Sequence, residues 1–177
     1  MTCVVAVRGS DKTVVLAADR GASTENTILE MATPKIFQYN RYLMGFAGSM
    51  SGDRLKYSFY PSDPDPQISL DEHMNTVFLL ELKEAYDETF ITYGTPDADL
   101  SILIVIDNAI YEHHSGDMSM IRLADDYVAL GTGAEYAYGA FWATEQIRST
   151  QTRAELAVGA AIKFSPTCAG KVDVLIG

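Results

Sequence analysis

The stretch TCVVAVRGSDKTVVLAAD, residues 2–19, decides the fold of this chain of 177 residues. It contains two apolar runs, TCVVAV and TVVLAAD, on either side of the polar segment RGSDK. Two such runs around a short glycine-containing turn predict a β-hairpin. Both runs are apolar at successive positions rather than at every second one, so we expect a sheet that is covered on both faces.

Further segments of strand length follow along the chain. They are KIFQ, YLMGFAG, SILIVI, AIYEHH, SMIRL, YVALG and KVDVLI. The first two flank a turn at residues 39–41 and predict a second strand pair. The next four lie close together in the sequence and predict a run of short strands. The last segment predicts a strand at the end of the chain.

Helix starts are marked by three capping boxes, in which a Ser or Thr is followed three residues later by Glu. The two side chains of such a box satisfy free backbone donors at the helix start. A further helix is predicted over about 51–59, where the proline-rich stretch PSDPDPQ ends it. The three capping boxes each predict one helix. Ser69 with Glu72 predicts a helix over about 69–90, Thr132 with Glu135 one over about 132–147, and Thr152 with Glu155 one over about 152–163.

The resulting order is strands, two helices, strands, two helices and a final strand. Two antiparallel sheets packed face to face, with helices outside, would bury both faces of each sheet and account for the strands without alternation. We therefore expect an α+β fold, a four-layer α-β-β-α sandwich. The length is that of one domain, which we place at residues 1–177.

The charge and the apolar runs exclude several classes of protein. The formal net charge is −11, which argues against a nucleic-acid partner and against docking on anionic membrane surfaces. The longest apolar runs are far too short to cross a bilayer, and no secretory signal is apparent. The two cysteines, Cys3 and Cys168, lie far apart in the sequence and do not suggest a disulfide framework. These features predict a reduced, cytoplasmic protein.

No cofactor or metal is expected. His113 and His114 are adjacent, so they would point to opposite faces of a strand, and no third ligand stands at a recognisable spacing. The glycine-containing stretch GTGAEYAYG lacks the Lys-Ser/Thr ending of a phosphate-binding loop.

Several motifs together give the chain a resemblance to proteasome β-type subunits, and in particular to the bacterial HslV-type peptidase. Thr2 opens the first strand, Ala17-Ala18-Asp19 ends the second, and Lys35 follows sixteen residues after Asp19 in PKIFQ. GFAGSMSGD at the first helix and YVALGTGAEYAYG before the third continue the resemblance. It covers nearly the whole chain.

The resemblance implies an N-terminal nucleophile hydrolase in which Met1 is removed and Thr2 attacks the substrate. A threonine hydroxyl is a weak nucleophile that needs an adjacent base. A free α-amine, with an unperturbed pKa of about 7.7–8.0, can take its proton near neutral pH. A neighbouring cation, here Lys35, favours the neutral amine and the ionised hydroxyl, and Asp19 would hold Lys35 in place. Other readings of these residues are a strand-start Thr, a solvated Lys and a turn Asp.

Two further positions complete the implied machinery. The backbone N–H of Gly48 would face the oxyanion that forms during acyl transfer. Thr132 stands where the family usually has a Ser near the nucleophile's amine, and it also reads as a helix cap. The segment Ser165-Pro-Thr-Cys168-Ala-Gly departs from the Asp-x-x-Ser-Gly-Gly of many β subunits. A hydroxyl thus replaces a carboxylate, and a thiol replaces a hydroxyl.

The resemblance also implies a pocket for the residue before the scissile bond. Its aromatic and Met side chains would make it apolar and rather full, although any of its members could simply belong to the core. By position the lining residues are Ala22, Thr33, Phe37, Phe46 and Met50.

These inferences together predict a threonine endopeptidase that acts on peptides or unfolded proteins inside a homo-oligomeric ring or stacked rings. Because the sequence has no ATPase motif, a separate ATP-dependent unfoldase would have to deliver folded substrates. One alternative is a ring subunit that keeps the fold and the interfaces but has lost its chemistry. Another is a small-molecule amidase, which would need a larger substrate-binding insertion than this length allows.

Overall fold

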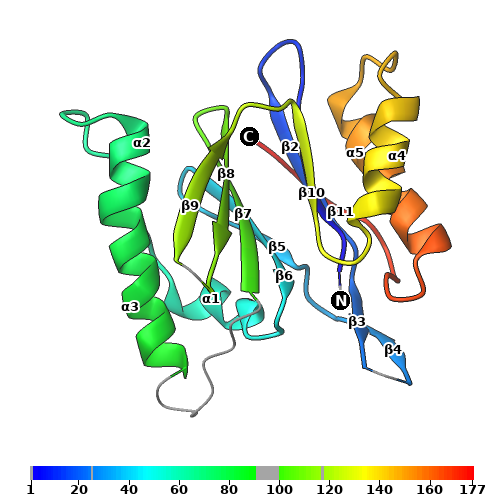
Figure 1. The fold of residues 1–177 in the computed structure, drawn as a ribbon, viewed down its shortest axis with the longest axis horizontal. Helices are drawn as coiled ribbons and strands as arrows, with labels where there is room; N and C mark the ends of the chain where they lie inside the picture. Colours follow the sequence, from blue (N-terminus) through cyan, green and yellow to red (C-terminus); the bar gives the residue numbers. More distant parts are fainter. Residues whose placement is uncertain (1, 25, 91–99, 117) are drawn as a thin grey trace.

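The computed structural model describes residues 2–24, 26–90, 100–116 and 118–177, and within these ranges the chain forms stacked layers of sheet and helix (Figure 1). The first sheet has the strand order β10-β1-β2-β11, with every neighbouring pair antiparallel. These strands are β1 (Val4–Arg8), β2 (Val14–Ala18), β10 (Tyr127–Leu130) and β11 (Asp173–Ile176). The hairpin predicted from residues 2–19 is thus the centre of this sheet.

The second sheet has the order β5-β6-β7-β8-β9 and is also antiparallel throughout. Asp107 and Asn108, in the turn between β7 and β8, both have positive φ, as the two central residues of a type I′ hairpin turn do. The five strands are β5 (Ile36–Tyr39), β6 (Tyr42–Gly48), β7 (Leu100–Ile106), β8 (Ala109–His114) and β9 (Ser119–Leu123).

Helices cover the outer face of each sheet (Figure 1). On the first sheet lie α4 (Ala134–Ala143) and α5 (Thr150–Phe164). On the second lies a continuous helical rod made of α2 (Leu70–His73), the π-helical turn η1 (Met74–Phe78) and α3 (Leu79–Phe90), with α1 (Gly52–Ser58) nearby. The predicted four-layer α-β-β-α sandwich is therefore confirmed. None of the described helices has both the length and the apolar character needed to cross a membrane.

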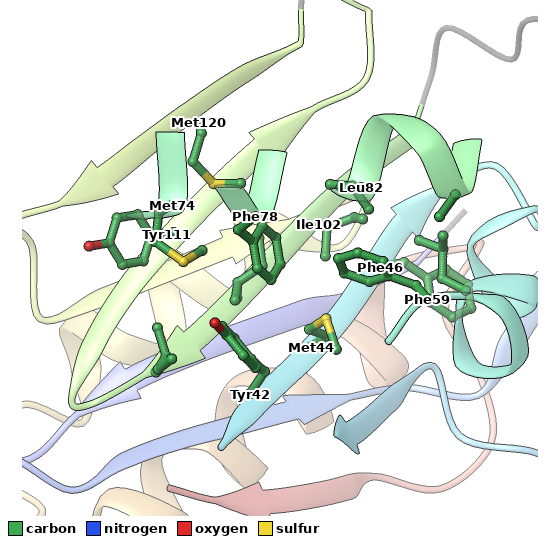
Figure 2. Close-up of a cluster of buried hydrophobic side chains, with 14 of the residues drawn as sticks. Tyr42, Met44, Phe46, Phe59, Met74, Phe78, Leu82, Ile102, Tyr111 and Met120 are labelled. Atoms are coloured by element: carbon green, nitrogen blue, oxygen red, sulfur yellow. The ribbon is translucent and has the colours of Figure 1, made fainter. Parts of the chain in front are cut away.

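The core consists of three apolar clusters, one between each pair of adjacent layers. The cluster between the sheets includes Val4, Leu16, Leu43 and Leu103, and it explains why the strands are apolar on both faces. The cluster under α2–α3 is rich in aromatic and Met side chains, as Figure 2 shows. The cluster under α4 and α5 is built mostly from Ala, Val and Cys.

Two of the predicted helix caps differ in the structure. Ser69 caps its helix as expected, because its hydroxyl accepts the Glu72 N–H. The fourth predicted helix instead begins after Ser149, whose hydroxyl accepts the Thr152 N–H one turn earlier than expected.

Thr132 is not a helix cap, so that interpretation of the sequence is wrong. Gly133 holds the N-cap position of α4 and no side chain caps it. The hydroxyl of Thr132 is engaged with another loop, described below. The helix is also shorter than predicted, ending at Ala143. The small hairpin of β3 (Gly21–Ser23) and β4 (Ile28–Glu30) was not predicted from the sequence.

Candidate active site

A buried ion pair lies at the centre of the candidate site. Asp19 directly follows β2, and Lys35 directly precedes β5 on the other sheet. The Lys35 Nζ lies 2.7 Å from the Asp19 Oδ1, and both side chains are 0% exposed. The two sheets therefore bring together residues sixteen positions apart, as the sequence predicted. Two charges without access to water are costly unless they are paired and hydrogen-bonded, and these are both.

The Asp19 carboxylate is held by three further backbone donors. Its Oδ1 accepts the N–H of Cys3 at 2.9 Å, and its Oδ2 accepts those of Gly21 at 2.9 Å and Ala169 at 3.1 Å. All four partners donate, which suits an ionised carboxylate because it can only accept. Asp19 thus ties the start of β1 to the loop before β11, and it fixes the ammonium of Lys35.

Thr2 is fixed next to this pair through its neighbour Cys3. The Cys3 N–H bonds the Asp19 side chain, and the Asp19 N–H donates to the Cys3 carbonyl at 3.1 Å. The Thr2 carbonyl accepts the N–H of Gly133 at 3.1 Å, and Thr2 is only 2% exposed. Met1, whose removal the sequence predicts, lies outside the described residues.

The loop from residue 131 to 133 packs tightly on Thr2 and requires glycine. Gly131 has φ +88°, and a Cβ at this position would lie 2.2 Å from the Thr2 carbonyl oxygen. The same Cβ would be 3.4 Å from that of Ala47, so the end of β6 also lies beside Thr2. Gly48 follows Ala47 with φ +92°, a conformation that L side chains rarely adopt. Gly48, whose N–H is predicted to face the oxyanion, thus directly follows Ala47, which packs near Thr2.

Thr132 lies between the two glycines that contact Thr2, and its side chain reaches the loop after α5. Its Oγ1 is 2.6 Å from the Oγ1 of Thr167, which in turn is 3.0 Å from the Oγ of Ser165. Three hydroxyls therefore form a chain of hydrogen bonds. Thr167 stands at its centre and was not singled out from the sequence.

The two cysteines, remote in sequence, are neighbours in the fold. The Cβ of Cys3 and the Sγ of Cys168 lie 2.7 Å and 2.8 Å from one point, the position of a Cβ on Gly133. Both are free thiols, and burial raises the pKa of each above its ordinary value. They are neutral groups in the wall of the site. Within the described ranges no group of His, Cys, Asp or Glu side chains could hold a metal.

The residues expected to line a substrate pocket have different environments. Phe46 is 1% exposed and belongs to the core under α2–α3 (Figure 2). The Lys56 Nζ lies 5.5 Å from its ring centroid. Phe37 is partly buried against the same cluster. Ala22 in β3 is half-buried, whereas Thr33 and Met50 are exposed. Thr33 and Met50 thus lie at the surface, whereas Phe46 is part of the core.

Comparisons with known proteins agree with this fold and extend across the chain. Residues 1–54 match the family model described as "Proteasome subunit". The structure is similar to that of BPH from Thiobacillus denitrificans, with a TM-score of 0.80 and 22% sequence identity over 99% of this chain and 97% of that one. For the same protein in complex with epoxomicin, the TM-score is 0.80 and the sequence identity is 20%, again over 99% of this chain and 97% of that one. For eukaryotic HslV from Trypanosoma brucei, the TM-score is 0.68 and the sequence identity is 23%, over 98% of both chains.

No curated protein matches the chain. The family match covers the segment that contains Thr2, Asp19 and Lys35, and the structural likeness covers almost all of the fold. The resemblance to proteasome subunits, inferred above from the motifs, is confirmed for residues 1–54, and the likeness to HslV is one of fold.

Proposed function

We propose that the protein is a threonine-type endopeptidase that hydrolyses peptide bonds inside a self-assembled ring, with Thr2 as its N-terminal nucleophile after removal of Met1. The match of the first 54 residues to proteasome subunits, together with a fold shared with HslV, supports a protease-type ring subunit. The threonine chemistry rests on the geometry of the site.

The buried pair of Asp19 and Lys35 beside Thr2 is the observation that carries the proposal. Apolar residues of similar volume often stabilise a protein as well as a buried ion pair, or better. A fully buried cation, paired with the same Asp19 oxygen that accepts the N–H of Cys3 next to Thr2, is therefore better explained by chemistry than by stability. The proposal gives Lys35 the role of favouring the neutral amine and the ionised hydroxyl of Thr2, as a neighbouring cation does.

The reaction follows from these positions. The Thr2 hydroxyl attacks the substrate carbonyl carbon while its proton passes to the α-amine, giving a tetrahedral oxyanion that the Gly48 N–H stabilises. The ammonium then gives its proton to the leaving nitrogen as the peptide bond breaks, which leaves an ester on Thr2. Water attacks this ester with the amine again as the base, and the acid product leaves with Thr2 restored.

A direct test compares Thr2→Ala with Thr2→Ser in protein shown by intact mass to lack Met1. Wild type is expected to cleave small fluorogenic peptides with an apolar residue before the reporter. Thr2→Ala keeps the amine and the strand but has no hydroxyl, so it should cleave nothing. Thr2→Ser keeps the hydroxyl and should retain partial activity. Cleavage by Thr2→Ala would show that the nucleophile is another residue.

Epoxomicin provides an independent readout, since it is the compound bound in the similar structure from T. denitrificans. A compound that reacts covalently with the nucleophile adds its mass to the chain. Wild type should gain the mass of the inhibitor, and Thr2→Ala should not. Labelling of both proteins to the same extent would contradict the assignment of Thr2.

The alternative function is a ring subunit that has lost its chemistry. Ser165 and Cys168 favour it, because they stand where many β subunits have Asp and Ser. If assembled wild type without Met1 neither cleaves peptides nor reacts with epoxomicin, this alternative replaces the proposal.

Assembly and delivery are part of the proposal. A chambered peptidase excludes folded proteins, so we expect an oligomer of mass far above one chain, in the cytoplasm, served by a separate ATP-dependent unfoldase. Sizing with light scattering measures the mass. A monomer across micromolar concentrations would contradict the chamber.

A further inference from the structure

Lys56, on α1, is a second lysine whose side chain is largely removed from solvent. It is 9% exposed, and its Nζ donates to the carboxylate of Asp53 on the same helix and to the carbonyl of Pro34. The Nζ also lies 5.5 Å from the centroid of the Phe46 ring, within the range of a cation–π contact. By contrast Lys83, which is paired with an Asp on α3, is 54% exposed. A simple Lys–Asp pair on a helix does not need burial, so Lys56 has a further role to explain.

Two of these partners are directly connected to Lys35. Pro34 precedes it in the chain, and the Phe46 N–H donates to the Lys35 carbonyl at 3.3 Å. Strand β5 begins only at the next residue, so Lys35 stands where the regular pairing with β6 ends. The contact of Lys56 with the Pro34 carbonyl thus fixes the main chain at the point where it leaves the sheet.

Helix α1 is itself held against the same phenyl ring. A Cβ on Gly52, the first residue of the helix, would lie 2.4 Å from the Cγ of Phe46. The start of the helix and the ring are therefore in direct contact, and Phe46 belongs to the core under α2–α3. Lys56 consequently connects the chain before Lys35 to a part of the molecule that is well anchored.

We infer that Lys56 is a positioning residue, which fixes the main chain immediately before Lys35 and thereby sets where the Lys35 ammonium stands relative to Thr2. The inference rests on the proposed function and extends its machinery to α1. Lys56 acts on no substrate atom in this account, only through Lys35. The influence of one charge on the protonation of another group falls with distance. A displacement of about 1 Å can cost about a hundredfold in rate, so the place of Lys35 matters for the reaction.

Lys56→Met removes the ammonium and keeps an unbranched side chain of similar length. Pro34 then loses its donor, and the chain before Lys35 is free to shift. With the Lys35 ammonium farther from Thr2, the charged form of the Thr2 amine is less disfavoured, so the amine takes up its proton at higher pH. The acid limb of the pH profile should therefore move to higher pH.

The loss of the Lys56 charge would by itself act in the same direction, and a double variant separates charge from position. Lys56→Met with Asp53→Asn removes one cation and one anion that are bonded to each other, so the net charge of α1 is unchanged. Other ionisable groups on the surrounding elements stay in place, and burial raises the pKa of both thiols among them. These groups are Asp19, Arg20, Lys35, Asp173, Cys3 and Cys168.

The test is the pH dependence of kcat and of kcat/KM for Lys56→Met and for the double variant, in protein that lacks Met1 and has the wild-type oligomeric mass. Both should show a plateau kcat about tenfold below wild type with KM within about twofold, since chemistry and not binding is impaired. Both should also show an acid limb about half a unit higher. The double variant leaves no unpaired charge on α1, so it keeps the test decisive if Lys56→Met folds poorly.

Lys83→Met is the matched control, because it breaks an exposed Lys–Asp pair on another helix. It should leave kcat, KM and the acid limb unchanged.

The inference is overturned if both Lys56 variants behave as wild type, or if they lose activity with no movement of the acid limb. It is also overturned if the movement occurs in Lys56→Met and disappears in the double variant, since charge and not position would then be the cause. In each of these outcomes the wild type is active, so the proposed function stands. If wild type is inactive and does not react with epoxomicin, the proposed function fails and this inference fails with it.

Discussion

The two outer layers of the sandwich are packed in opposite ways. Under α2–α3 the second sheet is covered by large side chains, among them Tyr42, Phe59 and Phe78, whose rings contact one another at centroid distances of 5.2 Å (Figure 2). Under α4 and α5 the first sheet meets Ala154, Ala157 and Ala161, all 0% exposed. Large side chains fill space between elements that stand apart, whereas small ones allow a helix to lie close to its sheet.

Much of the candidate site is built from the closely packed half. The loops before α4 and after α5 both come into contact with Thr2 or Asp19, at Gly133 and Ala169. A helix held close to the sheet by small residues leaves these loops little freedom. The closely packed half thus supplies Asp19 and the loops that hold Thr2, whereas Lys35 and Gly48 come from the second sheet.

Two ion pairs of the molecule also differ, in how far they are buried. Asp19 and Lys35 are fully buried, whereas Asp71 on α2 and Arg122 on β9, 3.2 Å apart, each have about half of the side chain exposed. A buried pair that loses one partner leaves an uncompensated charge, and an exposed pair does not. Substitutions in the two halves should therefore differ in size and in kind.

The largest effect is expected at Lys35. Lys35→Ala leaves Asp19 buried without its cation, which should lower the free energy of unfolding by about 3–5 kcal/mol. Peptidase activity of the folded fraction should fall by at least about a hundredfold, because the amine and the hydroxyl lose the neighbouring positive charge. Denaturant unfolding and kcat/KM measure the two effects.

Lys83→Ala is the matched control, since Lys83 forms an exposed pair with Asp87 on α3. It should change neither quantity appreciably. Activity of folded Lys35→Ala within twofold of wild type would remove Lys35 from the mechanism.

The next effect is expected in the aromatic cluster. Phe78 is 0% exposed, and Phe78→Ala should destabilise by about 3–5 kcal/mol through lost burial and a cavity. Phe78→Leu should cost less because it fills most of the space. kcat/KM of the folded variant should stay near wild type, because Phe78 belongs to the cluster under α2–α3 on the outer face of the second sheet. A large loss of kcat/KM in protein shown to be folded would contradict the expectation that the aromatic cluster affects stability and not catalysis.

A smaller effect is expected in the closely packed cluster. Ala157→Leu forces a larger side chain between α5 and the sheet and should cost about 1–3 kcal/mol. Gly159 on the same helix has open space around its missing Cβ, so Gly159→Ala should instead stabilise by about 0.5–1 kcal/mol. Chemical denaturation compares them. Equal tolerance of both would contradict close packing at Ala157.

The smallest effect is expected at Asp71. The hydrogen bond from Tyr111, followed by that from Arg122, lowers the pKa of this carboxyl below its ordinary value. A lowered pKa in the folded state stabilises the protein above the pKa of the unfolded state, and this is lost as the pH falls through the folded pKa. Asp71→Asn should therefore cost under about 1 kcal/mol at pH 7, with no difference from wild type in strong acid. A difference that persists undiminished in acid would contradict this linkage.

Much of the fold follows from local pattern. Runs such as AIYEHH and SMIRL became strands over the same residues, because their bounds are set by turns next to them. The cap of α5 was not determined by the local sequence. Ser149 and Thr152 can both serve as an N-cap, and only the packing of α5 decides which of them does. The β3–β4 hairpin is short and its second strand is exposed, so it left no apolar pattern to find.

The candidate site divides in the same way. The sequence by itself determined that a chain with Thr2, Asp19 and Lys35 at these spacings resembles a peptidase subunit, because short motifs keep their spacing along the chain. Only the tertiary structure decided that Phe46 is core, that Cys3 lies beside Cys168, and that the hydroxyls of Thr132 and Thr167 lie 2.6 Å apart. Each of these contacts joins segments far apart in sequence or depends on burial. The packing of layers, which no local pattern records, sets which side chains come within hydrogen-bonding distance.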